Sequence, residues 1–155
     1  MDRVSLGGMV AQLKTWLKIL LAMAAVLNTC YAEDWLSLGG GTIHFCQSCA
    51  YNDANVGLGI QHDVTPDLRA LGGVYYNSYY KATFYAGAAY QPLQVGWMRF
   101  GVMAGAVTNY PNLKYPFMAL PALSIEGDRM GVDILGVPSV GNHTGLISAN
   151  LKYKL

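Results

Sequence analysis

The stretch of sequence that decides the fold is the C-terminal run Gly145-Leu146-Ile147-Ser148-Ala149-Asn150-Leu151-Lys152-Tyr153-Lys154-Leu155. Its odd-numbered residues are glycine, apolar or aromatic, and its even-numbered residues after the first are polar or charged. A period of two is typical of a β-strand whose two faces meet different surroundings. The run therefore predicts an amphipathic strand at the end of the chain.

The same alternation occurs upstream. Apolar residues alternate with Gly or Gln over 56–61, and with Arg, Gly and Met over 98–106. Beyond the N-terminal segment no window sustains a helical period, while Tyr, Val, Thr and Phe favour strands. The sequence therefore predicts eight strands, at 35–45, 54–62, 69–77, 80–90, 97–107, 115–125, 129–137 and 144–155.

The composition excludes two broad classes of protein. Of the 155 residues, 53% are hydrophobic and 12% are charged, about half the charged fraction of an ordinary globular domain. A disordered chain needs the opposite balance. The formal charge is +1 and there is no Lys/Arg cluster, so no binding of nucleic acid is expected.

Strand number and patterning together predict the fold class. An even number of amphipathic strands in an apolar chain is typical of outer-membrane barrels, where closure satisfies every backbone polar group in lipid. The prediction is an all-β, eight-stranded antiparallel transmembrane β-barrel of the outer-membrane type. A soluble lipocalin-like barrel would turn its polar face outward, and charged residues are too scarce here to cover such a surface.

The N-terminus resembles a targeting segment. Lys14 and Lys18 precede the apolar run 19–27, and small residues ending in Ala32 follow it. This run of about nine residues is shorter than the roughly 20 that a spanning helix needs. We expect a cleaved signal peptide at 1–32, an outer-membrane barrel domain at 33–155, and a bacterial outer-membrane location. An uncleaved anchor is the alternative.

Topology sorts the polar residues between the two ends of the predicted barrel. With both termini on the periplasmic side, His44, Ser78, Tyr110 and His143 share the outer rim, and His62 lies at the opposite end. A His and a Ser on one rim are suited to act as general base and nucleophile in acyl transfer. From these residues alone, an ordinary polar rim without catalysis is the favoured interpretation.

Three further motifs have structural interpretations. Cys46-x-x-Cys49, in an exported loop, predicts a disulfide rather than a metal site. Gly39-Gly40-Gly41 indicates close packing or a kink in the first strand. Pro116 and Pro121 fall within a predicted strand and cannot donate to its ladder. The gaps they leave are compatible with a sideways opening to lipid or with a bulge.

Several segments resemble one family of barrels. From residue 77 onward they are residues 77–81, 86–93, 100–107, the proline-rich 115–123, and 137–142. Upstream they are Thr42-Ile43-His44, Tyr51-Asn52-Asp53 and Gly57-Leu58-Gly59. In order and spacing, residues from about 36 to 155 resemble the lipid A palmitoyltransferase family of outer-membrane barrels.

The resemblance implies an acyltransferase. That family moves a palmitoyl chain from a phospholipid to lipid A, using an essential His and an Asp-Ser pair at the extracellular rim. Carried over, the catalytic residues are His44, Ser78 and Asn77, and Asn77 stands where the family has Asp. Asn77 would be an orienting group, and Asn77→Asp is expected to raise activity. Phospholipid and lipid A are then the partners of a monomer, with no cofactor and no metal.

The alternative is a non-catalytic small barrel that binds lipid or modifies the cell surface. Asn77, and the lack of room for the family's amphipathic helix before the first strand, favour this alternative. The side chains that line the lumen would discriminate between the acyltransferase and the non-catalytic barrel, because a lumen packed with polar side chains does not hold a palmitoyl chain.

Overall fold

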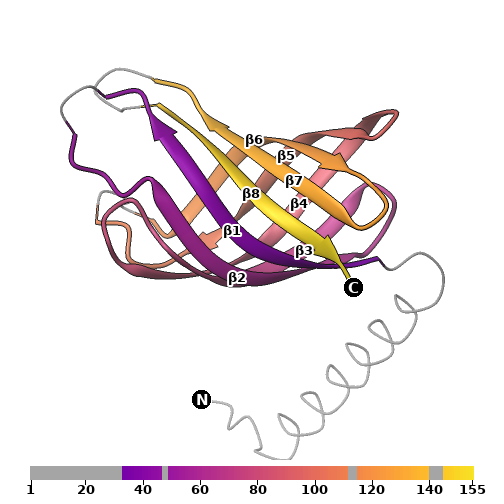
Figure 1. The fold of residues 1–155 in the computed structure, drawn as a ribbon, viewed down its shortest axis with the longest axis horizontal. Coiled ribbons are helices and arrows are strands. Elements are labelled where there is room, and N and C mark those ends of the chain that lie inside the picture. Colours follow the sequence, from indigo (N-terminus) through magenta and orange to yellow (C-terminus); the bar gives the residue numbers. More distant parts are fainter. Residues whose placement is uncertain (1–32, 47–48, 112–114, 140–144) are drawn as a thin grey trace, which may run out of the picture. The chain divides into compact units, whose positions relative to one another are not determined.

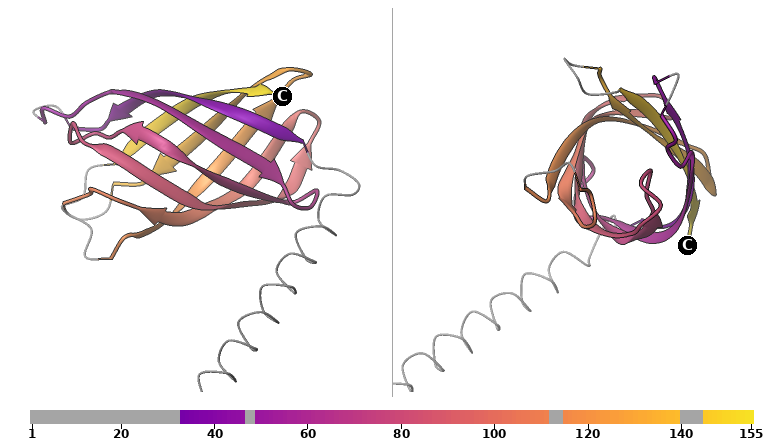
Figure 2. Two further views of the ribbon diagram at one scale, coloured as in Figure 1. Left: turned by 90° about the horizontal axis from the view of Figure 1, so that it is seen from below. Right: turned by 90° about the vertical axis from the view of Figure 1, so that its left-hand side faces the viewer.

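The computed structural model describes residues 33–46, 49–111, 115–139 and 145–155. Its strands form a closed antiparallel barrel in which each strand pairs with its neighbours in sequence and β1 pairs with β8 (Figure 1). The right-hand view of Figure 2 shows the strands arranged in a closed ring around the barrel axis. The strands are β1 (Asp34–His44), β2 (Ala54–Asp63), β3 (Leu68–Tyr76), β4 (Ala82–Val95), β5 (Met98–Val107), β6 (Phe117–Glu126), β7 (Met130–Val137) and β8 (Leu146–Lys154).

The predicted all-β, eight-stranded antiparallel barrel is confirmed, and all eight predicted strands are present. Strand β4 runs past the predicted end at residue 90, because a register shift between Tyr90 and Leu93 accommodates Pro92 in a bulge. The signal peptide expected at 1–32 lies outside the described residues. In the part of the chain that is described, no helix has the length and apolarity needed to cross a membrane.

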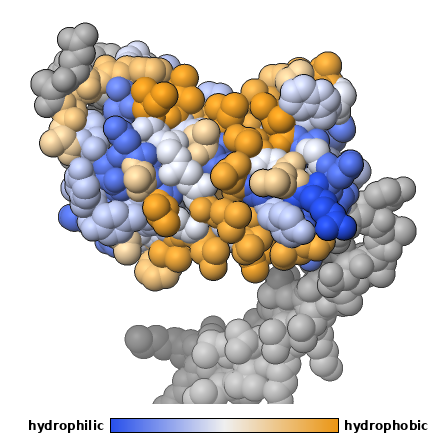
Figure 3. Space-filling view, in the orientation of Figure 1, coloured by the Kyte–Doolittle hydropathy of each residue, from blue (hydrophilic) through white to orange (hydrophobic). Residues whose placement is uncertain are grey.

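The outward face of the barrel is apolar, as the alternation predicted. In β8, Ile147 and Leu151 are 45% and 47% exposed, whereas Lys152 is 0% exposed. In β2, Val56, Leu58 and Ile60 point outward. Figure 3 shows apolar residues across the middle of the visible face. This is the reverse of a soluble barrel, and it is the pattern of barrels that lie in lipid.

A bulge in β1 reverses which residues of that strand face the lumen. Trp35 and Ser37 point inward before it, and Thr42 points inward after it, because the register shifts beyond Ser37 on both sides of the strand. Gly39 has φ +71°, and a Cβ on Gly40 would lie 1.7 Å from the Ala149 carbonyl oxygen. Both the close packing and the kink inferred from the three glycines are therefore present.

This bulge positions a functional residue. His44 lies two residues after Thr42 and shares its inward direction. Without the extra residue, a regular strand from Trp35 would turn His44 toward the outside. The glycine run thus sets the direction of a side chain several residues further along.

A network of charges fills the lumen at the end where residues 33 and 155 lie, which we call the terminal end. Arg69 is 1% exposed and donates to Asp63 at 3.0 Å and to Glu126 at 2.5 Å. Lys152 donates to Glu126 at 2.6 Å and to Asp133 at 2.7 Å. The charge network consists of Arg69, Arg99, Lys152, Asp63, Glu126 and Asp133. Its three positive and three negative side chains balance, which makes their burial tolerable.

The barrel wall is incomplete between β6 and β7. Phe117 to Ile125 pair with β5, but the ladder to β7 covers only Ala122 to Glu126. The segment from Phe117 to Pro121 therefore has no ladder partner in the described part of β7. The gap in pairing predicted from the prolines is confirmed at Pro121, and it lies in the half of β6 away from the terminal end. Pro116, also predicted to lie within the strand, lies just before it.

Candidate functional site

We call the end of the barrel opposite the terminal end the open end. Three side chains meet there. His44 Nε2 lies 2.9 Å from Ser78 Oγ, and His44 Nδ1 lies 2.8 Å from Asp53 Oδ1. The side chain of His44 is 7% exposed and that of Asp53 is 72% exposed. With the ring proton on Nδ1, His44 donates to Asp53 and accepts from the Ser78 hydroxyl. This is the arrangement of a Ser-His-Asp triad.

Backbone contacts hold the three residues together. His44 ends β1, Asp53 lies in the β1–β2 connection, and Ser78 lies in the β3–β4 turn. The Thr42 N–H donates to the Asp53 carbonyl at 2.8 Å, and the Asn52 N–H donates to the Ser78 carbonyl at 2.9 Å. The Asn52 side chain also donates to the Asn77 carbonyl at 3.1 Å. Asn52 therefore ties the two connections to each other beside the triad.

His44 and Ser78 are brought together as the topology predicted, but Asn77 plays a different part. Its side-chain oxygen accepts from the N–H groups of Tyr79 and Lys81, and its amide donates to Thr83 Oγ1 and to the Asn109 carbonyl. The side chain is 0% exposed. Among these contacts there is none with His44, so Asn77 shapes the Ser78 turn and does not orient the imidazole directly.

The carboxylate beside His44 comes from Asp53. In the sequence, Asp53 belongs to the segment Tyr51-Asn52-Asp53 that resembles the family, and no role was predicted for it. The Asp-Ser adjacency of the resembled family directed attention to residue 77, whereas here the carboxylate comes from a different connection. The signal available was the position of Asp53 directly before a strand that neighbours β1.

Aromatic rings continue the site along the open end. The Tyr51 ring lies 4.7 Å from the His44 ring and 5.6 Å from the Tyr79 ring, which lies 5.9 Å from that of Tyr110. The Tyr110 and Tyr75 hydroxyls are 2.6 Å apart. Burial raises the pKa of Tyr110, so its phenol is neutral near pH 7. Tyr110 thus lies at the predicted rim, while His143 lies outside the described residues.

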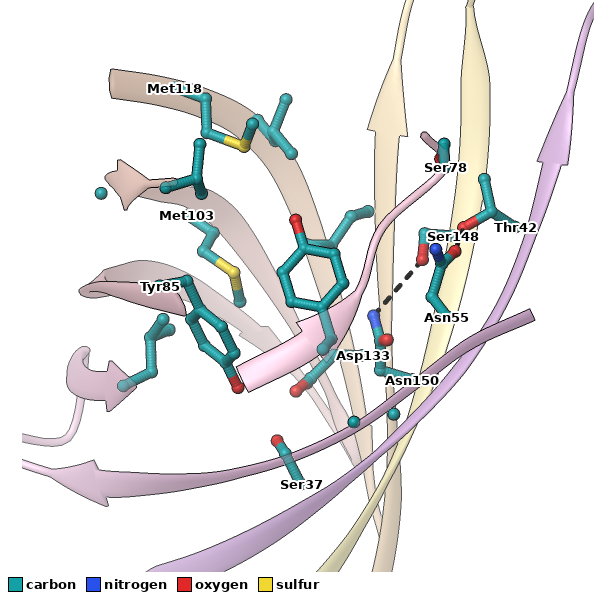
Figure 4. Close-up of a pocket in the computed structure, with 18 of the residues that line it drawn as sticks. Ser37, Thr42, Asn55, Ser78, Tyr85, Met103, Met118, Asp133, Ser148 and Asn150 are labelled. Atoms are coloured by element: carbon teal, nitrogen blue, oxygen red, sulfur yellow. Dashed lines mark hydrogen bonds between the residues drawn. The ribbon is translucent and has the colours of Figure 1, made fainter. Parts of the chain in front are cut away.

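A cavity of about 490 Å³ extends from the triad into the lumen, within the size range of small-ligand sites. Side chains of β3, β5 and β6 give it an apolar wall, made of Leu71, Met103, Met118 and Leu120. Side chains of β1, β2 and β8 give it a polar wall, made of Thr42, Asn55, Ser148 and Asn150. Figure 4 shows Met103 and Met118 on one side and these four polar residues together on the other.

The remaining predicted residues lie apart from the triad. Cys46 and Cys49 form the predicted disulfide, with Cα atoms 5.6 Å apart. His62 Nδ1 contacts Asp34 Oδ1 at 2.6 Å at the terminal end. Within the described ranges, no group of three or more His, Cys, Asp or Glu residues is placed to hold a metal ion.

Comparisons with known proteins bear on the fold alone. No family model matches the sequence, and no curated protein matches it. Among solved structures, the N-terminal β-barrel domain of Pseudomonas aeruginosa OprF is similar, with a TM-score of 0.50 and 14% identity over 80% of this chain and 97% of that chain. These findings do not support the lipid A palmitoyltransferase family specifically. The chain has the fold of an eight-stranded β-barrel of the outer-membrane type.

Proposed function

We propose that this protein is an outer-membrane acyltransferase that moves a palmitoyl-type chain from a phospholipid to lipid A. The observation that carries the proposal is the position of His44 between Ser78 and Asp53 at the mouth of a cavity with an apolar wall. Positioned acid–base and nucleophilic groups are what acyl transfer requires.

The chemistry proceeds in two halves. Ser78 Oγ attacks the ester carbonyl of the donor while His44 Nε2 takes the hydroxyl proton. The tetrahedral adduct then expels the donor alcohol, which receives that proton from His44, and an acyl-serine ester remains. A hydroxyl of the acceptor attacks this ester with His44 again as base, and Ser78 regains its proton. Asp53 holds the ring through Nδ1–H and stabilises its positive charge.

The barrel wall suits a membrane location for this reaction. Its outward residues are apolar, so the barrel would span the outer membrane with the open end at the outer leaflet, where both lipids meet the triad. The unpaired segment Phe117 to Pro121 of β6 lies in the half of the wall nearer the open end. A lipid chain would enter the lumen there without the rupture of β6–β7 ladder hydrogen bonds.

The test is acyl transfer in reconstituted vesicles. The barrel is folded into vesicles that contain lipid A and a phospholipid with an isotope-labelled palmitoyl chain, and lipid A is analysed by mass spectrometry. The native barrel should produce labelled lipid A, Ser78→Ala and His44→Ala should abolish the product, and His62→Ala should leave it unchanged. Labelled product at the native rate from Ser78→Ala would overturn the proposal.

A second candidate is a barrel that binds lipid without catalysis. The polar wall favours it, because Asn150 and Ser148 face part of the lumen that a plain hydrocarbon chain would occupy. Under this candidate no labelled lipid A forms with any variant, while a lipid copurifies with the native barrel.

A further inference from the structure

The two walls of the cavity make different demands on a ligand. The apolar wall packs against methylene groups, whereas the polar wall offers hydroxyl and amide groups (Figure 4). A plain hydrocarbon chain without a polar substituent would satisfy only the apolar wall. A buried polar group that loses water without gaining a partner is unfavourable, so the polar wall selects for a chain that carries a hydrogen-bonding group.

Of the four side chains in the polar wall, Ser148 and Asn150 are the two that can still form hydrogen bonds to a ligand. Asn150 Nδ2 lies 3.5 Å from Ser148 Oγ, and Ser148 Oγ lies 3.4 Å from the Gly41 carbonyl oxygen. Both distances exceed the usual range of such bonds, roughly 2.5–3.2 Å. Asn55, by contrast, donates to the Tyr76 carbonyl at 2.9 Å and accepts from Thr42. Ser148 and Asn150 are half-buried and line the cavity.

The strand register places this pair close to the catalytic end. His44 pairs with Leu146, Thr42 with Ser148, and Gly40 with Asn150. Descending from the triad along β8, a chain therefore passes Leu146 first, then Ser148, then Asn150. The polar side chains therefore lie just below the triad, and the apolar wall faces them across the lumen. A bound chain whose ester lies at the triad would meet Ser148 and Asn150 near its ester end.

At the end of the cavity nearer the charge network, the polar side chains already form hydrogen bonds with one another. Gln61 Nε2 donates to Ser37 Oγ at 2.8 Å and to Asp133 Oδ2 at 2.7 Å, and Ser124 donates to Asp133 at 2.6 Å. The charge network closes the lumen below them. Hydrogen bonds to a ligand are therefore available mainly at Ser148 and Asn150.

We propose that the acyl chain held in this cavity carries a hydroxyl group near its ester, as a 3-hydroxyacyl chain does. The hydroxyl donates to Asn150 Oδ1 and accepts from Ser148 or from Asn150 Nδ2, while the rest of the chain packs on Met103 and Met118. This rests on the proposed acyl transfer, and it makes a hydroxylated acyl chain the preferred donor in place of an unsubstituted palmitoyl chain. Sites that hydrogen-bond a substrate hydroxyl discriminate strongly against the analogue that lacks it.

Two matched esters test the selection. The native barrel in phosphatidylcholine vesicles is given p-nitrophenyl 3-hydroxymyristate or p-nitrophenyl myristate, and kcat/KM is measured for each. We expect the hydroxylated ester to react at least about ten times faster. Asn150→Leu and Ser148→Ala should each reduce this ratio, and Ala149→Val, on the outward face of the same strand, should keep it. A ratio of one or less in the native barrel, or an unchanged ratio in Asn150→Leu, overturns the inference.

A binding measurement separates this inference from the proposed reaction. Ser78→Ala, which retains the cavity without the nucleophile, is titrated with 3-hydroxymyristic acid and with myristic acid. Tighter binding of the hydroxylated acid that is lost in Ser78→Ala/Asn150→Leu supports the inference even if neither ester turns over, in which case acyl transfer alone fails. Turnover of both esters, together with equal binding of the two acids, upholds acyl transfer and refutes the inference.

Discussion

Asp53 Oδ1 lies 2.8 Å from His44 Nδ1, on the opposite side of the ring from Ser78 Oγ. The carboxylate thus comes from the connection that follows the strand of the histidine, not from the residue before the serine. Asn77 occupies that neighbouring position and serves the turn instead. The contrast changes which substitutions are expected to affect activity.

Asp53→Asn should lower acyl transfer and leave the barrel folded. An amide at this position can hold the wrong tautomer of His44 and cannot stabilise its charge. Because Asp53 is 72% exposed, we expect a loss of about 10- to 100-fold, below the roughly 10⁴-fold loss at a buried triad. Initial rates in vesicles measure the effect. Asp34→Asn, which alters the carboxylate beside His62, is the matched control and should retain the native rate.

Asn77→Asp should destabilise the barrel rather than raise its activity. The carboxylate cannot donate to Thr83 Oγ1 or to the Asn109 carbonyl, and its charge would be buried beside that carbonyl oxygen. Leaving such groups unpaired costs about 1–3 kcal/mol each. Urea unfolding followed by tryptophan fluorescence measures the loss. Greater activity at unchanged stability would restore the expectation based on the resembled family.

Gly40→Ala should disturb both folding and the site. A Cβ at residue 40 would meet the Ala149 carbonyl oxygen at 1.7 Å, so β1 and β8 must separate there, at a cost of about 1–3 kcal/mol. Gly136→Ala is the control, since a Cβ there meets nothing within 4 Å. Refolding yield, from the heat-dependent mobility of the barrel on gels, reports the difference. Equal yields of the two variants would argue against the tight β1–β8 contact.

Leu151→Arg should oppose insertion into a membrane. Leu151 is 47% exposed on the outward face, and an arginine there costs about 2–4 kcal/mol if the residue lies near the middle of the bilayer. Equilibrium unfolding from vesicles gives the value. Asn150→Arg, which faces the lumen, is the comparison and should cost less. A larger penalty at residue 150 would contradict the assigned facing.

The sequence was sufficient for the strands and their facing, because residues such as Leu151 and Lys152 alternate with the period of a strand. It also placed His44 and Ser78 at one end, because that follows from counting antiparallel strands. It did not identify Asp53, because the path of the β1–β2 connection depends on hydrogen bonds such as that between Thr42 and Asp53. The partners of Asn77 depend in the same way on the fold of two connections.

The contacts within the charge network could not be predicted from the sequence either. Alternation shows that Arg69 and Glu126 each face the lumen, but the two are 57 residues apart in the chain. Their contact depends on barrel size and strand stagger, which periodicity does not specify. The β1 bulge was predictable only in part. The glycine run indicated a kink, but the direction in which the bulge turns His44 depends on the strand register, which the sequence does not specify.

The central claim is that His44 and Asp53 make Ser78 an activated nucleophile, and covalent labelling tests it most directly. The folded barrel is treated with an alkyl fluorophosphonate, and the intact mass and labelled peptide are determined. We predict a single adduct on Ser78 that is absent from His44→Ala and slower to form in Asp53→Asn. No adduct on the native barrel, or equal labelling of Ser78 in His44→Ala, would contradict the account.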